Sequence, residues 1–470
     1  MSKSIKNIRL YNTLSGKKDF FKPRKGKKVN LFVCGPTVYD FSHIGHARTY
    51  VIFDCFARYL KNRGFDVFYL QNITDVDDKI IQRAREKGVG AKDLADAFTK
   101  EHLKDMEMLG VASVKKYAKA TDYIKEIINQ VRRLQEKGFA YTLEDGIYFD
   151  ITTFKSYGKL SHRTVLQAED SVSRIDYHKD KRNRGDFALW KFAVEGEPSW
   201  PAPFGAGRPG WHIEDTAITE KFFGPQYDIH GGGRDIMFPH HEAEITQMES
   251  LSGKVPLAKY WMHTGFLTID GQKMSKSLNN GITIADFLKR YSAGQLRFWI
   301  AKNLWSSPLD YSESTMIEVK MALEKIEEFI RKLKTIKLSV KSPAVIKSIK
   351  TAKEDFYREL ADDFNTPRAF AVVFELIKET NKLLDKNEVD KKSATEMYKF
   401  FEELNKIFGI IDFKKLKISN VPKEVVELAK TREQYRKSQN WQKSDELRAE
   451  IAKYGYAVDD TKDGTVLKKI

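Results

Sequence analysis

The sequence predicts an α/β fold with a parallel sheet near its start. Val29 to Val33 is a short apolar run of β-branched and aromatic residues, and Gly35-Pro36 prevents its continuation. The pattern from His43 to Arg63 is helical. Asp66 to Ile73 is a second apolar run. A strand, a helix and a strand at this spacing form a parallel crossover unit, which binds ligands at the carboxyl ends of its strands.

Helical patterns dominate the rest of the chain. Three follow the second strand and four lie beyond Ser312; they are Asp77 to Lys87, Lys92 to Leu109, Thr121 to Lys137, Thr315 to Lys334, Pro343 to Leu360, Pro367 to Leu384 and Ala394 to Phe408. Pro422 to Tyr454 predicts further helices, and short strands are expected around Tyr456 to Val458 and Thr465 to Leu467. Two more strands are expected at Ile147 to Ile151 and Tyr227 to His230. The fold is therefore a parallel-sheet domain followed by an all-α region.

Composition limits the class of protein. The 470 residues are 41% hydrophobic, enough for roughly three domains. A net charge of +16 suits an acidic partner such as nucleic acid, although charge alone identifies none. The first thirty residues are basic without an apolar segment, which predicts a basic arm or a disordered tail on a cytoplasmic protein. Two cysteines, Cys34 and Cys55, exclude a disulfide framework, and no apolar run is long enough to span a membrane.

His43-Ile44-Gly45-His46 stands at the predicted start of the first helix. Histidines at i and i+3 project from one face of the first turn, and Gly45 allows a flat ligand to approach the backbone. Free backbone N–H groups and the positive end of the helix favour an anion there, so the pattern suggests a polyphosphate site. Alone it would be weak, because core and surface histidines are commoner than nucleotide-binding ones.

The second signal is Lys273-Met274-Ser275-Lys276-Ser277, in a polar turn. Two lysines in a loop can close on a triphosphate and neutralise the charge that develops when the α-phosphorus is attacked. A solvated loop is the alternative for the lysine pair taken alone. No Gly-X4-Gly-Lys-Ser/Thr loop occurs, so an ordinary phosphate-loop nucleotidase is unsupported.

These motifs resemble those of a known family. His43 to His46 is similar to the HIGH signature of class I aminoacyl-tRNA synthetases, and Lys273 to Ser277 matches their KMSKS signature. Five longer blocks resemble the cysteinyl-tRNA synthetases in particular: Cys34 to Asp40, Asn72 to Ile81, Gly207 to Glu214, Asp228 to Glu244 and Asp362 to Pro367. The resemblance runs from about Leu10 to the C-terminus.

The resemblance implies a Rossmann-like catalytic domain interrupted by a connective peptide, then a helical bundle and a small anticodon-binding domain. The expected divisions are a first catalytic half (1–111), the connective peptide (112–205), a second catalytic half (206–250), a stem-contact region with the lysine loop (251–314), the bundle (315–412) and the anticodon-binding domain (413–470). It also implies a monomer. The insertion is too short for a hydrolytic editing domain.

The resemblance assigns roles to residues of the nucleotide site. His43 and His46 would stabilise the phosphates, and Lys276 with Lys273 would hold the pyrophosphate side. ATP would also contact Gly45, Gly231, Gly232, Gly233 and Asp235, and Mg²⁺ would accompany it. A flexible turn is the alternative for the three glycines. The amino-acid pocket is expected to include Cys34, Gly35, Thr74, Trp211 and His240, with a purely structural role as the alternative for Trp211.

A metal site is the third implication. The family holds zinc with two Cys, one His and one Glu, and these positions fall on Cys34, Asp215, His240 and Glu244, so an aspartate replaces one cysteine. Carboxylate keeps the charge of thiolate and is an accepted zinc ligand, but oxygen loosens the preference for zinc. The alternative is a metal-free site in which Asp215 and Glu244 pair with His240. Zinc would favour a substrate thiolate over the hydroxyl of serine, which makes editing unnecessary.

The expected reaction joins L-cysteine to tRNA(Cys) with ATP, through a cysteinyl-adenylate. Near the C-terminus Arg432, Arg436, Lys437 and Trp441 could contact tRNA by phosphate binding and stacking, with a solvated helix face as the alternative. Two other functions stay open, a cysteine ligase that acts on an amino-sugar amine and an inactive paralogue that only binds tRNA. Asn279 and Leu467 depart from the family pattern, which puts local geometry in doubt.

Overall fold

The computed structural model describes residues 8–163, 178–273, 281–338, 343–416, 422–461 and 464–469. It divides into two compact units. The first comprises Met1–Phe329 and Leu333–Ile411, and the second comprises Ile330–Lys332 and Asp412–Ile470. No described helix is both long and apolar enough to cross a bilayer.

A five-stranded sheet of order β11-β10-β3-β4-β5 forms the centre of the first unit, and each neighbouring pair is parallel. Its strands are β3 (Lys28–Val33), β4 (Asp66–Ile73), β5 (Lys116–Lys119), β10 (Tyr227–Gly233) and β11 (Ala258–Thr264). Helix α1 (Ile44–Asn62) connects β3 to β4, so the predicted strand, helix and strand are confirmed. A parallel sheet needs cover on both faces, which explains why most residues of β3 and β4 are buried.

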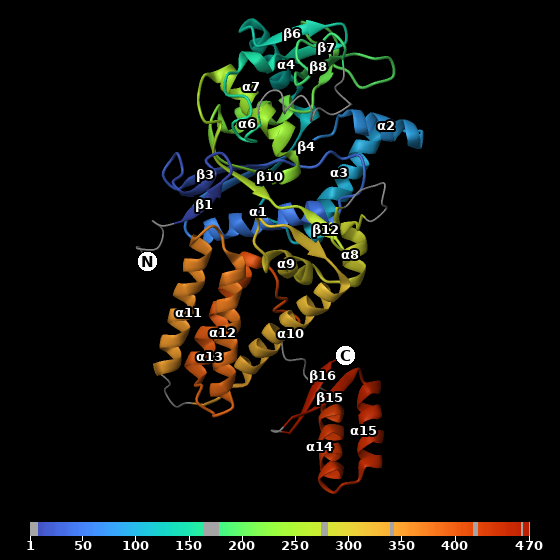
Figure 1. Ribbon diagram of the computed structural model, residues 1–470. Helices are drawn as coiled ribbons and strands as arrows, with labels where there is room; N and C mark the ends of the chain where they lie inside the picture. The colour runs from blue at the N-terminus through green and yellow to red at the C-terminus, as the bar shows by residue number, and fades with distance from the viewer. Residues whose placement is uncertain are drawn as a thin grey trace. The chain divides into compact units, whose positions relative to one another are not determined.

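Helices cover the two faces of this sheet. Figure 1 shows α1 and α3 (Ala91–Met108) on one face, and α6 (Ile213–Phe223) and α7 (Glu242–Ser252) on the other. The predicted helices at 77–87 and 92–109 are confirmed as α2 (Asp78–Lys87) and α3. The pattern at 121–137 forms a short turn followed by α4 (Ile124–Glu136).

Strand pairing crosses the predicted domain divisions near residues 112, 206 and 250, and the divisions themselves stay a prediction. β5 pairs with β4, so the central sheet extends past residue 112, where the insertion was expected to begin. β11 pairs with β10, so the second catalytic half extends past residue 250. The insertion has its own antiparallel sheet, β6-β7-β8-β9, formed by Ala140–Leu143, Gly146–Phe149, Phe187–Phe192 and Gly207–Pro209. Short edge strands carry little sequence pattern, because strand pairing is decided by tertiary contacts.

The glycine run was expected to follow its strand, but Gly231, Gly232 and Gly233 belong to β10 itself. A Cβ on Gly231 would lie 2.3 Å from the ring of Phe53 on α1, and one on Gly232 would lie 2.6 Å from the ring of His241. These glycines therefore admit side chains of the protein from both faces of the sheet.

A smaller sheet, β13-β12-β14, carries the start of the lysine signature. It consists of β12 (Leu267–Ile269), β13 (Gln272–Lys273) and β14 (Leu309–Tyr311). Helices α8 (Ile284–Arg290) and α9 (Ala293–Ala301) separate β13 from β14 in the chain. The first unit also contains the hairpin β1 (Arg9–Asn12) and β2 (Lys17–Phe20).

The predicted all-α region is confirmed. It consists of α10 (Glu313–Thr335), α11 (Pro343–Ala361), α12 (Thr366–Leu384) and α13 (Lys391–Phe408). Phe364, in the turn between α11 and α12, packs edge-on against Phe56 of α1, and α13 also contacts α1. The bundle is thereby joined to the helix that begins with the two histidines.

The second unit contains α14 (Lys423–Lys437), α15 (Trp441–Lys453) and the antiparallel pair β15 (Tyr456–Thr461) and β16 (Gly464–Lys469). Its small core is formed by Val425, Ala429, Ile451, Tyr456 and Val458, with Leu467 packed against them. The predicted helices and strands of this segment are thus confirmed.

Candidate active site

The start of α1 is closed by its own histidines. The Nδ1 atom of His43, the N-cap residue, accepts the backbone N–H groups of Gly45 at 3.1 Å and His46 at 3.4 Å. The Nδ1 atom of His46 accepts the N–H of His43 at 3.2 Å, and the two rings stack with centroids 3.8 Å apart. This reciprocal arrangement is a capping box built from two imidazoles. The backbone donors that were expected to be free for an anion are therefore occupied.

The capping bonds fix which nitrogen of each ring carries the proton. A neutral imidazole that accepts at Nδ1 donates from Nε2. Burial, followed by the neighbouring His43, lowers the pKa of His46 well below its ordinary value, so His46 is neutral at pH 7. Both rings thus offer an Nε2–H donor, and these donors take the place of the backbone N–H groups as candidates for binding phosphate.

The segment that follows the lysine signature lies against these histidines. Ile44 donates its N–H to Ile282 O at 3.0 Å, and Ile284 donates to Ser42 O at 3.0 Å. His43 and Thr283 form an isolated antiparallel bridge. The backbone of Lys273 ends β13, whereas Met274 to Ser277, with Lys276, and Asn279 lie outside the described residues. The described flank of the lysine signature is therefore hydrogen-bonded to the predicted phosphate-binding turn.

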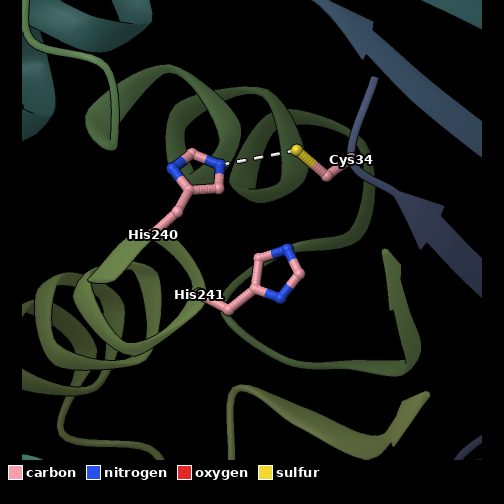
Figure 2. Close-up of side chains that lie close together, drawn as sticks. All are labelled: Cys34, His240 and His241. Atoms are coloured by element: carbon pink, nitrogen blue, oxygen red, sulfur yellow. Dashed lines mark hydrogen bonds between the residues drawn. The ribbon is translucent and has the colours of Figure 1, made fainter. Parts of the chain in front are cut away.

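The four predicted metal ligands come from separate elements and meet in the core. Cys34 follows β3, Asp215 lies in α6, and His240 precedes Glu244 of α7. Figure 2 shows His240 facing Cys34, with Nε2 3.5 Å from Sγ. The same Nε2 lies 3.0 Å from Asp215 Oδ2 and 3.3 Å from Glu244 Oε1, and all four residues are buried.

The local backbone differs from the prediction of a plain helix after Pro239. A single π-helical turn covers Met237–His241, and α7 begins only at Glu242. His240 and Glu244 still lie at i and i+4, and their side chains face the same point.

The cluster has more acceptors than donors. Asp215 Oδ1 and both oxygens of Glu244 are buried, and none of them has a hydrogen-bond partner among the described residues. Burial, together with the charges of Asp215 and Glu214, raises the pKa of Glu244 well above its ordinary value. Burial, together with the charges of Asp215 and Glu244, raises the pKa of the Cys34 thiol well above its ordinary value. Buried acceptors without donors are the pattern that a bound cation would satisfy, so the residues fit a divalent metal ion.

Comparison with known proteins places the chain in a family. Residues 20–321 match the family model described as tRNA synthetases class I (C) catalytic domain, and residues 355–412 match the DALR domain. The chain is 42% identical to the cysteine–tRNA ligase of Thermococcus gammatolerans, which it covers to 99% with 98% of its own length. The chain belongs to the class I cysteinyl-tRNA synthetase family.

Another relative agrees with this family, and a solved structure shares the fold. The cysteine–tRNA ligase of Thermoplasma volcanium is 44% identical over 97% of this chain and 99% of the relative. A structure of Mycobacterium tuberculosis methionyl-tRNA synthetase with methionyl-adenylate has a TM-score of 0.62, 15% identity, and coverage of 81% of this chain and 89% of that one. At that identity the similarity shows the fold alone, and the fold is the predicted α/β class.

Three residues predicted for the amino-acid pocket pack near the predicted metal ligands or next to them in the chain. The ring of Trp211 stacks on His240 with centroids 4.3 Å apart. Thr74 donates its hydroxyl to the buried Glu214 carboxylate. A Cβ on Gly35 would lie 1.8 Å from Asn72 O, so only glycine fits there. Trp211 therefore contacts the cluster through His240, and the contact of Trp211, Thr74 and Gly35 with an amino acid stays a prediction.

Several histidines near the cluster were missed from the sequence. His212 Nδ1 lies 2.8 Å from His240 Nδ1, and burial lowers the pKa of His212 well below its ordinary value. His241 Nδ1 lies 2.9 Å from His263 Nε2, and His230 Nδ1 lies 3.4 Å from Glu244 Oε2. His212, His230 and His241 lie in blocks that carry the family resemblance, which was the available signal.

The predicted nucleotide contacts divide into two groups. Gly231 and Gly232 leave room for the rings of Phe53 and His241, so packing within the protein is enough to explain a glycine at both positions. Gly233 and the exposed Asp235 lie at the carboxyl end of β10, where parallel sheets bind ligands.

The predicted tRNA residues lie on α14 and at the start of α15. Arg432 is buried and forms two hydrogen bonds with Asp460, at 2.7 and 2.8 Å, so its guanidinium is already engaged within this unit, and its phosphate contact stays a prediction. Lys437 pairs with Glu433 at 3.0 Å. Trp441 is 57% exposed, and the guanidinium carbon of Arg436 lies 5.7 Å from its ring centroid. An exposed indole beside a cation suits base stacking.

Proposed function

We propose that this protein joins L-cysteine to tRNA(Cys) in two steps that consume ATP. One carboxylate oxygen of cysteine attacks the α-phosphorus, the bond to the β-phosphate oxygen breaks, and cysteinyl-adenylate and pyrophosphate form. A hydroxyl of the terminal tRNA ribose then attacks the carbonyl carbon, and AMP leaves. The observation that carries this proposal is the stacked pair His43 and His46, capped through Nδ1 at the start of α1, with the described flank of the lysine signature bonded beside them.

The roles of the residues follow from their chemistry. His43 and His46 donate from Nε2 to phosphate oxygens on which negative charge increases in the transition state. Neutral donors suit this task, because they lose less by burial than cations do. Lys276, with Lys273, neutralises the departing pyrophosphate, and Mg²⁺ enters with ATP.

Cys34, Asp215, His240 and Glu244 would hold the metal ion, with zinc as the family's choice. When bound, zinc supplies selective ligation of a thiolate over a hydroxyl. Two carboxylates and one thiolate provide three negative charges, and His240 provides a neutral donor. The contact between His240 Nδ1 and His212 orients the His240 ring, so that Nε2 of His240 faces the thiol and the two carboxylates. Trp211 covers the other side of the ring.

Cysteine-dependent exchange of pyrophosphate into ATP tests the first step. The wild-type protein should catalyse exchange with cysteine and reject serine, and exchange should fall after the metal is removed and return with Zn²⁺. Exchange without any dependence on cysteine would refute the substrate, and full activity of the stripped protein would refute the role of the metal. An inactive paralogue would show no exchange at all.

Trp441→Ala tests the proposed tRNA surface. Loss of one base-stacking platform should weaken tRNA binding about tenfold, since one stacked base contributes about 1–3 kcal/mol. Cysteine-dependent exchange should stay unchanged, because this step does not involve tRNA. Tyr454→Ala is a matched control, as Tyr454 is also exposed in this unit, at 50%. Equal tRNA affinity in wild type and Trp441→Ala, measured by filter binding, would exclude Trp441 from the interface.

A further inference from the structure

Arg48 is a buried cation on α1, two residues after His46. It is 2% exposed, and burial lowers its pKa to about 10. Among the described residues its guanidinium contacts backbone carbonyls and no carboxylate. The side chain donates to Phe266 O, to Ser307 O and, at 3.4 Å, to Trp305 O.

These carbonyls belong to two segments that lie against each other. Phe266 O also accepts the N–H of Leu309 at 2.9 Å, and Trp305 O accepts the N–H of Gly265 at 3.1 Å. A Cβ on Gly265 would lie 2.2 Å from Ser307 O, so glycine permits this close approach. The two segments lead directly into β12 and β14, which pair with each other.

The same sheet carries the lysine signature. β13 pairs with β12 and ends at Lys273. The hydroxyls of Thr49 and Thr264 add a second contact between α1 and the segment before β12, at 2.8 Å. The guanidinium of Arg48 thus connects the helix that begins with His43 and His46 to the sheet from which the lysine signature continues.

Stability alone does not explain an arginine at this position. A buried cation without a carboxylate is costly, and apolar residues of similar size often stabilise a protein as well or better. An arginine, however, presents planar donors in a fixed fork and can hold two segments at a set spacing, whereas the ammonium of a lysine cannot reproduce this geometry.

We propose that Arg48 is a positioning residue for adenylate formation, which holds the helix of His43 and His46 in register with the sheet β13-β12-β14 so that histidines and lysines act on the same triphosphate. This inference rests on the proposed function. Arg48 does not touch the substrate, and its effect passes through the groups that do. A misplacement of about 1 Å in such a site can cost a factor of about 100 in rate.

The test is a double-mutant cycle on cysteine-dependent pyrophosphate exchange. Arg48→Lys should lower kcat about 10- to 100-fold and leave the KM for cysteine within about threefold. In a Lys276→Ala background the same substitution should cost less than about threefold, because the contact that Arg48 positions has already been removed. Equal losses in both backgrounds, or an unchanged kcat in Arg48→Lys, would overturn the inference.

Arg297→Lys is the matched control. Arg297 is also about 1% exposed, but it donates to Phe408 O, Leu109 O and Asp54, away from the sheet of the lysine signature. Its substitution should lower the melting temperature. Any fold-loss of kcat should be the same in the wild-type and Lys276→Ala backgrounds, because the two residues act independently.

Gly265→Ala provides a second route if Arg48→Lys does not fold. The added methyl group would push the two segments apart while Arg48 stays in place, and the same loss of kcat and the same coupling to Lys276→Ala are expected. Additivity in this variant would overturn the inference as well. A wild-type protein without cysteine-dependent exchange would instead refute the proposed function and the inference with it, so the two failures are distinguishable.

Discussion

The start of α1, proposed as an anion site, and the cluster around His240, proposed as a cation site, are both built on histidines, which are partly exposed in the first region and buried in the second. At α1 each Nδ1 accepts a backbone N–H, so the ring proton is expected on Nε2, where a donor suits an anion. At the cluster, Nε2 of His240 faces Cys34, Asp215 and Glu244, and three carboxylate oxygens have no described donor. The nitrogen that each ring presents to its site therefore sets the charge of the ligand that we expect there.

The largest expected effect belongs to the anion site. Lys276→Ala should lower the rate of adenylate formation by about 100- to 1,000-fold, because a group that stabilises transition-state charge is lost. The affinity for cysteine should change little, since cysteine is expected to bind at the other cluster. Single-turnover adenylate formation and equilibrium cysteine binding measure the two quantities. Equal losses in adenylate formation and in cysteine affinity would refute the assignment of Lys276 to the transition state. They would also mean that the two regions do not act on separate ligands.

The next effect separates the cation site from the anion site. Asp215→Asn removes one negative charge from the cluster and should weaken Zn²⁺ affinity by at least about 100-fold, whereas Asp215→Cys should retain it. The KM for ATP should stay the same in both variants. Zinc content after dialysis against a graded chelator gives the affinity without reference to activity.

Glu214→Gln is the control for that experiment. Glu214 is a buried neighbour of Asp215, but its carboxylate accepts the hydroxyl of Thr74 and is not part of the described group formed by Asp215, His240 and Glu244. Metal affinity should therefore persist in this variant. Undiminished zinc binding in Asp215→Asn would show that the carboxylate is not a ligand, and the excess of acceptors would need another cation.

The sequence predicts the elements around His43 better than the contacts around His240 and Arg432. The strand, helix and strand around His43 follow from local pattern and end where expected, because apolar periodicity and Gly64 act within a few residues. His212, His230 and His263 could not be predicted as neighbours of the cluster, since they come from separate elements that only the packing of α6, β10 and β11 brings together. The burial of Arg432 was not predicted, because the sequence does not show that Asp460 of β15 lies beside it.

The smallest expected effect concerns the neutral state of the histidines beside α1. His102 Nδ1 lies 3.1 Å from the hydroxyl of Ser42, next to the N-cap, and burial lowers the pKa of His102 to about 4. The unfolded chain therefore binds more protons than the folded protein between pH 6.5 and 4. The contribution of the neutral His102 to the free energy of unfolding is fully present above pH 6.5 and decreases as the pH falls. His102 alone accounts for a loss of roughly 2 kcal/mol between pH 7.5 and 4.5.

His102→Gln removes this titration, and its free energy of unfolding should fall less steeply with acid than that of the wild type. Urea unfolding at pH 7.5 and 4.5 measures the difference, and His162→Gln, at an exposed position, is the control. An identical decrease in wild type and His102→Gln would mean that His102 is not kept neutral by burial. Desolvation would then no longer explain why His102, beside the N-cap of α1, stays neutral.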